Sequence, residues 1–274
     1  MVGSGRSTIS PRPGSWIQKP RVVFSVDMTT APFSGGDTRR RVLGDLTVGL
    51  PVALVVAIAT WSLLDLPATY TLRVLALYAA VSGLILTTVP ADLPGPGFGL
   101  ANRITLARLL PLLSLAALAV RAGELGVAGR WWVVLLGTAI MVLDGVDGRI
   151  ARSTSTQTRF GARFDMETDA FLLLVLSVLV WADGRAGAWV VLIGAMRYLF
   201  VAAAWLLPAL RVELPPSLRR KVVCVVAGIA LLVSLGPIIP DPIAAGVAAV
   251  GLAAITWSFA VDVVWLLMNH RARR

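Results

Sequence analysis

The chain has 274 residues, of which 57% are hydrophobic and only 15% are charged. Soluble domains carry roughly 25% charged residues, so this composition excludes an ordinary soluble protein and indicates a membrane protein. In a soluble protein the formal net charge of +10 would suggest a nucleic-acid partner. Here the arginines lie between long apolar runs, so we expect anionic lipid head groups and phosphorylated substrates as partners, and no nucleic acid.

Cysteine and histidine each occur once, as Cys224 and His270. A single cysteine excludes an internal disulfide and a cysteine-built metal site within the chain. Cys224 lies in an apolar run and is expected to be a small core residue. Because His270 lies in the basic C-terminal tail, a histidine-based metal or catalytic site is not expected.

Residues 1–41 are rich in Gly, Ser, Pro and Arg and contain no apolar span, so they are predicted to form a flexible basic extension. Eight apolar segments follow, each close to the roughly 20 residues that a helix needs to cross a bilayer. Since backbone polar groups in lipid must be satisfied internally, we expect these segments to be helices. They are predicted at 46–64, 70–89, 104–121, 131–150, 166–182, 187–208, 220–238 and 243–268.

The predicted fold is an all-α polytopic membrane bundle. Two additional transmembrane helices within 42–99 precede a six-helix unit within 100–274. With eight spans, most arginines fall on one side, including Arg39 to Arg41 and the C-terminal arginines, whereas the other side holds mainly Arg121, Arg130 and Arg185. The positive-inside rule then places both termini and the loop after the fourth span in the cytoplasm. A bacterial plasma membrane is the expected location.

Four aspartates lie close together where the fourth and fifth spans meet. On a helix, residues at i, i+3, i+4 and i+7 share one face. A first stripe with this spacing consists of Asp144, Asp147, Gly148 and Ala151. Two carboxylates thus stand beside two residues that have almost no side chain.

A second stripe has the spacing i, i+4 and i+8 and consists of Gly161, Asp165 and Asp169. Two facing helices would present four carboxylates around a pocket with small-residue walls, which a flat group such as a nucleotide could enter. Ionisable groups near membrane depth are functional candidates by default. The alternative interpretation is an acidic, solvated helix end. Glu167 lies on the opposite face and is expected to be solvated or structural.

Clustered carboxylates repel one another unless a cation lies between them. All-oxygen ligands suit Mg²⁺, Mn²⁺ or Ca²⁺ better than zinc, and magnesium often bridges carboxylates to substrate phosphates. Arg152 could add hydrogen-bond donors for phosphate oxygens. These residues together indicate a metal-held diphosphate.

The same stretch resembles the CDP-alcohol phosphatidyltransferase family. The family signature reads D-x-x-D-G-x-x-A-R, eight residues, then G-x-x-x-D-x-x-x-D, and every fixed position is present between Asp144 and Asp169. The resemblance implies a six-helix fold and transfer of a phosphatidyl group from a CDP-linked lipid, expected to be CDP-diacylglycerol, to the hydroxyl of an acceptor alcohol with release of CMP. It also implies two divalent ions, Mg²⁺ or Mn²⁺, bound by Asp144, Asp147, Asp165 and Asp169.

The resemblance assigns Asp169 a further role, as general base on the acceptor hydroxyl. It assigns CDP binding to Gly148, Ala151, Arg152 and Gly161. Upstream, a polar stripe resembles the family's N-x-x-T-x-x-R element and is expected to join the CDP site; it consists of Asn102, Thr105 and Arg108. The alternative for this stripe is an amphipathic interfacial helix with snorkelling arginines.

The sequence indicates the residues that would bind the acceptor less specifically than it indicates the carboxylate site. Arg197 lies inside the sixth apolar span and is predicted to hold an acceptor phosphate, and Asp262 could pair with it or line the same cavity. The basic run Arg219, Arg220 and Lys221 could bind a phosphorylated acceptor or lipid head groups, or could be ordinary positive-inside charge. A homodimer is also considered.

Two other functions remain open. Intramembrane carboxylates also suit a cation- or proton-coupled transporter, although transporters tend to place their sites at the bilayer midplane, whereas these aspartates cluster near one end of the spans. A family member that has lost catalysis and serves as a scaffold is the third possibility, which the intact set of aspartates disfavours.

Overall fold

A computed structural model describes residues 35–90, 98–154, 158–212, 214–215 and 217–272, with the side chains of 35–37, 146–154 and 270–272 outside the description. Every regular element within these ranges is helical, which confirms the predicted all-α class. The α-helices are α1 Gly35–Leu63, α2 Thr69–Thr88, α3 Leu100–Leu118, α4 Val127–Thr154, α5 Arg159–Ala182, α6 Leu192–Leu206, α7 Leu218–Leu235 and α8 Asp241–Ala272. Three short 3₁₀ helices are η1 Ala119–Glu124, η2 Ala188–Val191 and η3 Pro208–Arg211.

Each of the eight predicted spans corresponds to one α-helix, but several helices are longer than their apolar runs. The first begins at Gly35, so the stretch 35–41 is helical and does not belong to a flexible extension. Likewise, α4 continues to Thr154 and α8 comprises 32 residues. Hydropathy marks only the part of a helix that is apolar, whereas backbone hydrogen bonding continues through polar turns beyond it.

Six helical segments in the described part of the chain are long and apolar enough to cross a membrane. The two α-helices outside this set are α5 and α7. The first half of α5 carries five charged residues, and α7 begins with Arg219, Arg220 and Lys221. Their charge, and not a lack of helix, separates them from the other six. The protein is therefore an integral membrane protein, and the count of eight spans stays a prediction.

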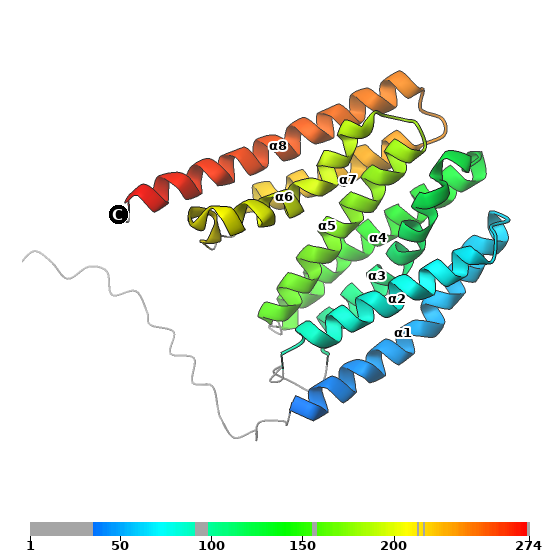
Figure 1. Cartoon of the computed structure of the whole chain (residues 1–274), viewed down its shortest axis with the longest axis horizontal. Coiled ribbons are helices and arrows are strands. Elements are labelled where there is room, and N and C mark those ends of the chain that lie inside the picture. The colour runs from blue at the N-terminus through cyan, green and yellow to red at the C-terminus, as the bar shows by residue number, and fades with distance from the viewer. Residues whose placement is uncertain (1–34, 91–97, 155–157, 213, 216, 273–274) are drawn as a thin grey trace, which may run out of the picture. The chain divides into compact units, whose positions relative to one another are not determined.

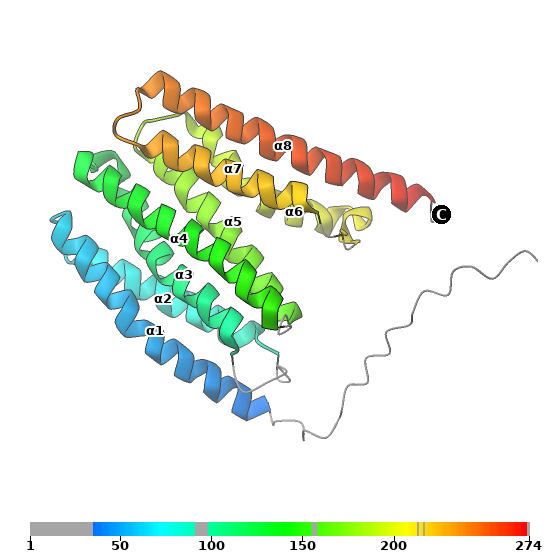
Figure 2. The same cartoon turned by 180° about the vertical axis from the view of Figure 1, so that it is seen from behind.

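The packing places α3 between two groups of helices. On one side α1 and α2 contact each other and α3, and on the other side α3 contacts α4 and α5 (Figure 1). Beyond them α7 packs against α4 and α5, and α8 packs against α6 and α7, as the reverse view also shows (Figure 2). Since consecutive helices reverse direction, the start of α3, the end of α4 and the starts of α5 and α7 come together at one end of the bundle.

Small residues allow the closest helix contacts. A Cβ atom built on Gly194 of α6 would lie 2.1 Å from the Cα atom of Leu174 in α5. Only glycine permits two backbones to approach this closely, as is common between membrane helices. Buried hydroxyls add interhelical hydrogen bonds, such as the one that Tyr70 donates from α2 to the carbonyl of Ser114 in α3, at 3.1 Å.

Candidate active site

Three carboxylates from the second half of α4 and the first half of α5 lie close together. One oxygen from each of Asp144, Asp165 and Asp169 lies within 4.8 Å of the corresponding oxygens of the other two. Asp165 and Asp169 are one helical turn apart on α5, so both point to the same side. The three side chains remain between 35% and 47% exposed, so this cluster is open to a ligand.

A buried arginine from α3 lies against all three carboxylates. The side chain of Arg108 is only 1% exposed, and its Nη1 atom lies 2.7 Å from an oxygen of Asp144 and 2.7 Å from an oxygen of Asp165. Its Nη2 atom donates to Asp169. Burying a guanidinium is costly unless opposite charges pair with it, which these aspartates do. The family resemblance predicts Arg108 in the CDP site, and the structure places it against the carboxylates as their internal counter-charge.

The charge balance of this cluster fits a divalent cation. Three ionised aspartates and one guanidinium leave two negative charges in excess. Their oxygen atoms are the hard ligands that Mg²⁺ and Mn²⁺ prefer, and their mutual separation lets them share one ion. The donor set therefore fits the metal that the sequence predicted.

Part of the predicted site lies outside the described side chains. Asp147 and the CDP-site candidates Gly148, Ala151 and Arg152 belong to this part of α4. Their roles stay predictions.

The polar stripe on α3 is buried. Asn102 and Thr105 are each 5% exposed. The Nδ2 atom of Asn102 donates to the carbonyl of Phe98 at 2.6 Å, and the hydroxyl of Thr105 donates to the carbonyl of Ala101 at 3.2 Å. A solvated amphipathic surface would leave such groups exposed, so this burial disfavours the interfacial-helix alternative.

Gly161 lets the start of α5 approach this stripe. A Cβ atom at this position would lie 2.5 Å from Oδ1 of Asn102 and 3.1 Å from Oγ1 of Thr158. Thr158 caps α5 by accepting a hydrogen bond from the Gly161 amide at 2.9 Å. A threonine just before a helix is a known capping signal that could have been read from the sequence.

Gly161→Ala is expected to destabilise the protein, because the added methyl group must displace the buried Asn102 amide. Overpacking of this kind costs about 1–3 kcal/mol. Thermal unfolding in detergent measures the effect. Gly145→Ala is the matched control, since a Cβ atom there meets nothing within 4 Å. Equal melting temperatures for the two variants would contradict this packing.

The start of α7 comes near the cluster. The positive charge of Lys221 favours the ionised form of Asp144, and the charges of Asp169 and Asp144 disfavour ionisation of the Cys224 thiol one turn later. Cys224 is exposed, so the prediction that it is a small core residue is wrong. The apolar run indicated a buried position, but the residue lies on the side of α7 that faces the carboxylates.

Other predicted acceptor residues lie elsewhere. Arg197 pairs with Glu167 at 2.5 Å, and helical spacing places Glu167 on the face of α5 opposite Asp165 and Asp169. The structure therefore does not bring Arg197 to the carboxylate cluster. Glu167, expected to be solvated or structural, is half exposed and holds this arginine.

The predicted pair of Arg197 and Asp262 does not form. Asp262 of α8 instead pairs with Arg219 at 2.5 Å and with Arg220 at 3.2 Å. Arg219 also donates to the backbone carbonyl of Ser258 at 2.5 Å. Together these contacts join the start of α7 to α8, around a cavity of about 220 Å³. Hydropathy could not foresee this pairing, because it depends on how the last two helices pack.

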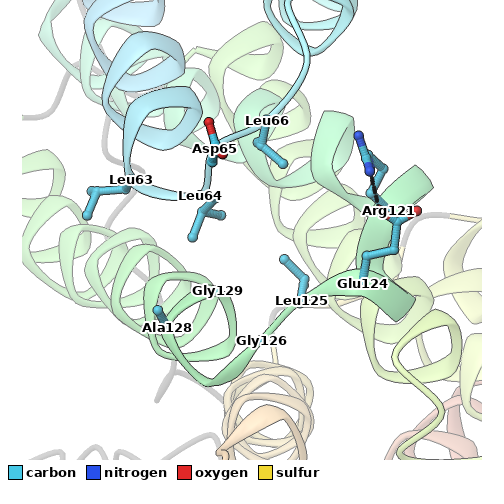
Figure 3. A pocket seen from close by; sticks show the side chains of 10 residues that line it. All are labelled: Leu63, Leu64, Asp65, Leu66, Arg121, Glu124, Leu125, Gly126, Ala128 and Gly129. Atoms are coloured by element: carbon cyan, nitrogen blue, oxygen red, sulfur yellow. Dashed lines mark hydrogen bonds and ion pairs between the residues drawn. The ribbon is translucent and has the colours of Figure 1, made fainter.

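A larger cavity lies at the opposite end of the bundle, between the α1–α2 turn and the start of α4 (Figure 3). It has a volume of about 320 Å³. Its only arginine, Arg121, is paired with Glu124, and Asp65 adds a further negative charge. Along α4, Gly129 is about 22 Å from Asp144 at 1.5 Å per residue. This cavity lacks the carboxylate cluster and is not the candidate site.

Comparison with known proteins gives one match. The family model described as CDP-alcohol phosphatidyltransferase matches residues 98–264. This range begins just before α3 and contains the carboxylate cluster, Arg108 and Lys221. No curated protein and no solved structure gives a significant match.

Proposed function

The chain belongs to the CDP-alcohol phosphatidyltransferase family, and we propose that it transfers a phosphatidyl group from CDP-diacylglycerol to an alcohol and releases CMP. The family indicates the transferase reaction, phospholipid synthesis and a membrane setting. The observation that supports the proposal best is the carboxylate cluster. Asp144, Asp165 and Asp169 occupy signature positions, and their oxygens converge within 4.8 Å.

In the proposed site, Asp144, Asp165 and Asp169 hold divalent metal together with Asp147. The metal, when bound, would neutralise the diphosphate of the donor and stabilise the negative charge on the leaving CMP. Arg108 holds the carboxylates in place from the buried side. Because this arginine touches all three carboxylates, their positions are fixed before substrate arrives, which lowers the cost of organising the site.

The proposed reaction is a direct displacement at phosphorus. The acceptor hydroxyl oxygen forms a bond to the phosphorus of the phosphatidyl group. The bond from that phosphorus to the oxygen bridging the two phosphates breaks, and this oxygen leaves with CMP. Asp169 takes the proton of the hydroxyl as the oxygen attacks. No oxidant, reductant or further reactant is needed.

On the nucleotide side, we propose that Asn102, Thr105 and Gly161 contribute to the CDP site together with Gly148, Ala151 and Arg152. The burial of Asn102 and Thr105, and the close approach of Asn102 to Gly161, support this assignment. On the acceptor side, Lys221 is the basic residue with the best support, since it is near enough to the cluster for its charge to act on Asp144. The pairing of Arg219 and Arg220 with Asp262 supports a role in joining α7 to α8.

The experiment is a panel of candidate acceptors incubated with purified protein, CDP-diacylglycerol and Mg²⁺ or Mn²⁺. Glycerol phosphate, inositol phosphate, serine and a lipid alcohol represent the main chemical classes, and product mass identifies the one used. We expect CMP and one new phospholipid in equal amounts. If none of these alcohols yields CMP while vesicles containing the protein show metal flux, the transporter is the better description.

We further propose that both termini and the active site face the cytoplasm. The opposite end carries mainly Arg121, Arg130 and Arg185, whereas more of the basic residues that flank the spans lie at the active-site end, among them Arg219 and Lys221. The positive-inside rule counts lysine and arginine, so this bias supports a cytoplasmic active-site end.

Cys224 provides a direct test of this orientation, because it is the only cysteine of the chain and is exposed beside the cluster. A charged thiol reagent that cannot cross membranes is expected to modify it in inside-out vesicles and to leave it unmodified in intact cells. Mass spectrometry measures the modification, and Cys224→Ser supplies the background. Labelling from outside intact cells would contradict the proposed orientation.

A further inference from the structure

The N-terminal helix pair contacts the active-site helix from the side away from the carboxylates. Both α1 and α2 pack against α3, although the family match begins only at residue 98. Near the carboxylate end of the bundle, this packing includes an ion pair between Asp45 Oδ1 of α1 and Arg103 Nε of α3, at 2.9 Å. The additional helices therefore reach the first turn of α3.

Arg103 directly follows Asn102 in that turn. Consecutive residues on a helix point about 100° apart, so the two side chains leave α3 in different directions. Asn102 points to α5, where its Oδ1 atom lies against Gly161, while Arg103 points to α1. The Asn102 side chain therefore connects this turn of α3 to the proposed site, and the Arg103 side chain connects the same turn to α1.

The first turn of α3 needs such support. It follows Gly99, the N-cap residue, whose φ of +80° lies in the left-handed region. Among the described residues, no side chain caps this helix start with a hydrogen bond. A link from a neighbouring helix can therefore fix its position.

Asp45 is suited to this task because its carboxylate is largely buried. The side chain is 15% exposed, and its second oxygen, Oδ2, is buried and has no hydrogen-bond partner within the described part of the chain. A buried carboxylate costs free energy unless an opposite charge compensates it. A helix pair that served only as a membrane anchor would be more stable with an apolar residue here.

We propose that Asp45 is a positioning residue of the active site: its ion pair with Arg103 fixes the first turn of α3 and, through it, the Asn102 side chain. The N-terminal helix pair then helps to position the active site and does not serve only as a membrane anchor. This inference rests on the proposed function, since Asn102 belongs to the proposed CDP site.

The test compares Asp45→Asn and Arg103→Gln with the charge-swapped double variant Asp45→Arg/Arg103→Asp. We expect each single change to raise the KM for CDP-diacylglycerol roughly tenfold, the size typical of outer contacts that orient a site. Because the swap restores opposite charges, it should recover most of the lost affinity, as coupled residues do in a double-mutant cycle. The KM, kcat and melting temperature are measured for every variant in detergent.

Thr60→Val is the matched control. It removes the 3.0 Å hydrogen bond between Trp132 Nε1 and Thr60 Oγ1, also on α1 but about 22 Å further along the helix at 1.5 Å per residue. It should leave the KM unchanged. A wild-type KM in Asp45→Asn, or an equal rise in Thr60→Val, would overturn the positioning role alone. Wild-type protein that releases no CMP would overturn the proposed function, and the positioning role with it.

Discussion

Asp169→Asn is expected to reduce turnover about 10²- to 10⁴-fold, the contribution of a general base, while CDP still binds. Asparagine keeps an oxygen that can accept the hydrogen bond from Arg108, so the geometry of the site should survive. It cannot take up the proton of the acceptor hydroxyl. The dissociation constant of CDP and the rate of CMP release separate binding from chemistry.

Glu167→Gln is the control for this variant. It makes the same chemical change on the same helix, but on the face away from the cluster, where Glu167 pairs with Arg197. We expect near-normal turnover from Glu167→Gln. Near-normal turnover from Asp169→Asn would instead show that another group takes the proton.

Arg108→Gln is expected to make stability strongly dependent on divalent metal. Without the guanidinium, three carboxylates remain within 4.8 Å of one another. Two like charges about 5 Å apart near a protein surface repel by about 3 kcal/mol. In EDTA the variant should therefore melt well below the wild type. Mg²⁺ should raise its melting temperature by more than it raises that of the wild type, because the ion replaces the lost charge and stabilises the state that binds it.

Arg185→Gln is the matched control, because Arg185 is also buried and paired, but at the other end of the bundle. It pairs with Asp241 and donates to the carbonyls of Ser234 and Gly236. Its loss should lower the melting temperature by the same amount with and without Mg²⁺. If Arg108→Gln responds to Mg²⁺ no more than the wild type does, Arg108 is not the counter-charge of the cluster.

The helices were predictable because a membrane imposes one simple requirement on them. Each apolar run of about 20 residues became a helix. Helix ends were harder to predict. Hydropathy predicted that the first helix starts at 46, whereas α1 starts at Gly35. It predicted that the fourth helix ends at 150, whereas α4 ends at Thr154. In both cases polar turns outside the apolar run continue the helical hydrogen bonding.

The carboxylate site was predictable to the extent that it is local in sequence. Spacing on a helix correctly placed Asp165 and Asp169 on one side and set Glu167 apart. The contacts between distant segments could not be read from spacing. Arg108 lies 57 residues before Asp165, and nothing in its own neighbourhood shows that it contacts three aspartates.

The acceptor side shows the same limit. Arg197 was expected to face the polar cavity because it lies inside an apolar span, yet it pairs with Glu167 outside the cluster. Asp262 was considered a partner of Arg197 and instead contacts Arg219 and Arg220. A charged residue in an apolar run signals a partner, but only the packing of α5, α6, α7 and α8 determines which one.

Metal-dependent release of CMP is the measurement that tests the central claim most directly. Purified wild-type protein and Asp165→Asn are incubated with CDP-diacylglycerol and the acceptor identified by the panel, first in EDTA and then with increasing Mg²⁺ or Mn²⁺. The proposed site predicts no CMP in EDTA, CMP and an equal amount of phospholipid once metal is added to the wild type, and at most trace release from Asp165→Asn. Release of CMP that persists in EDTA, or that Asp165→Asn leaves unchanged, would contradict the assignment of the carboxylate cluster as the catalytic metal site.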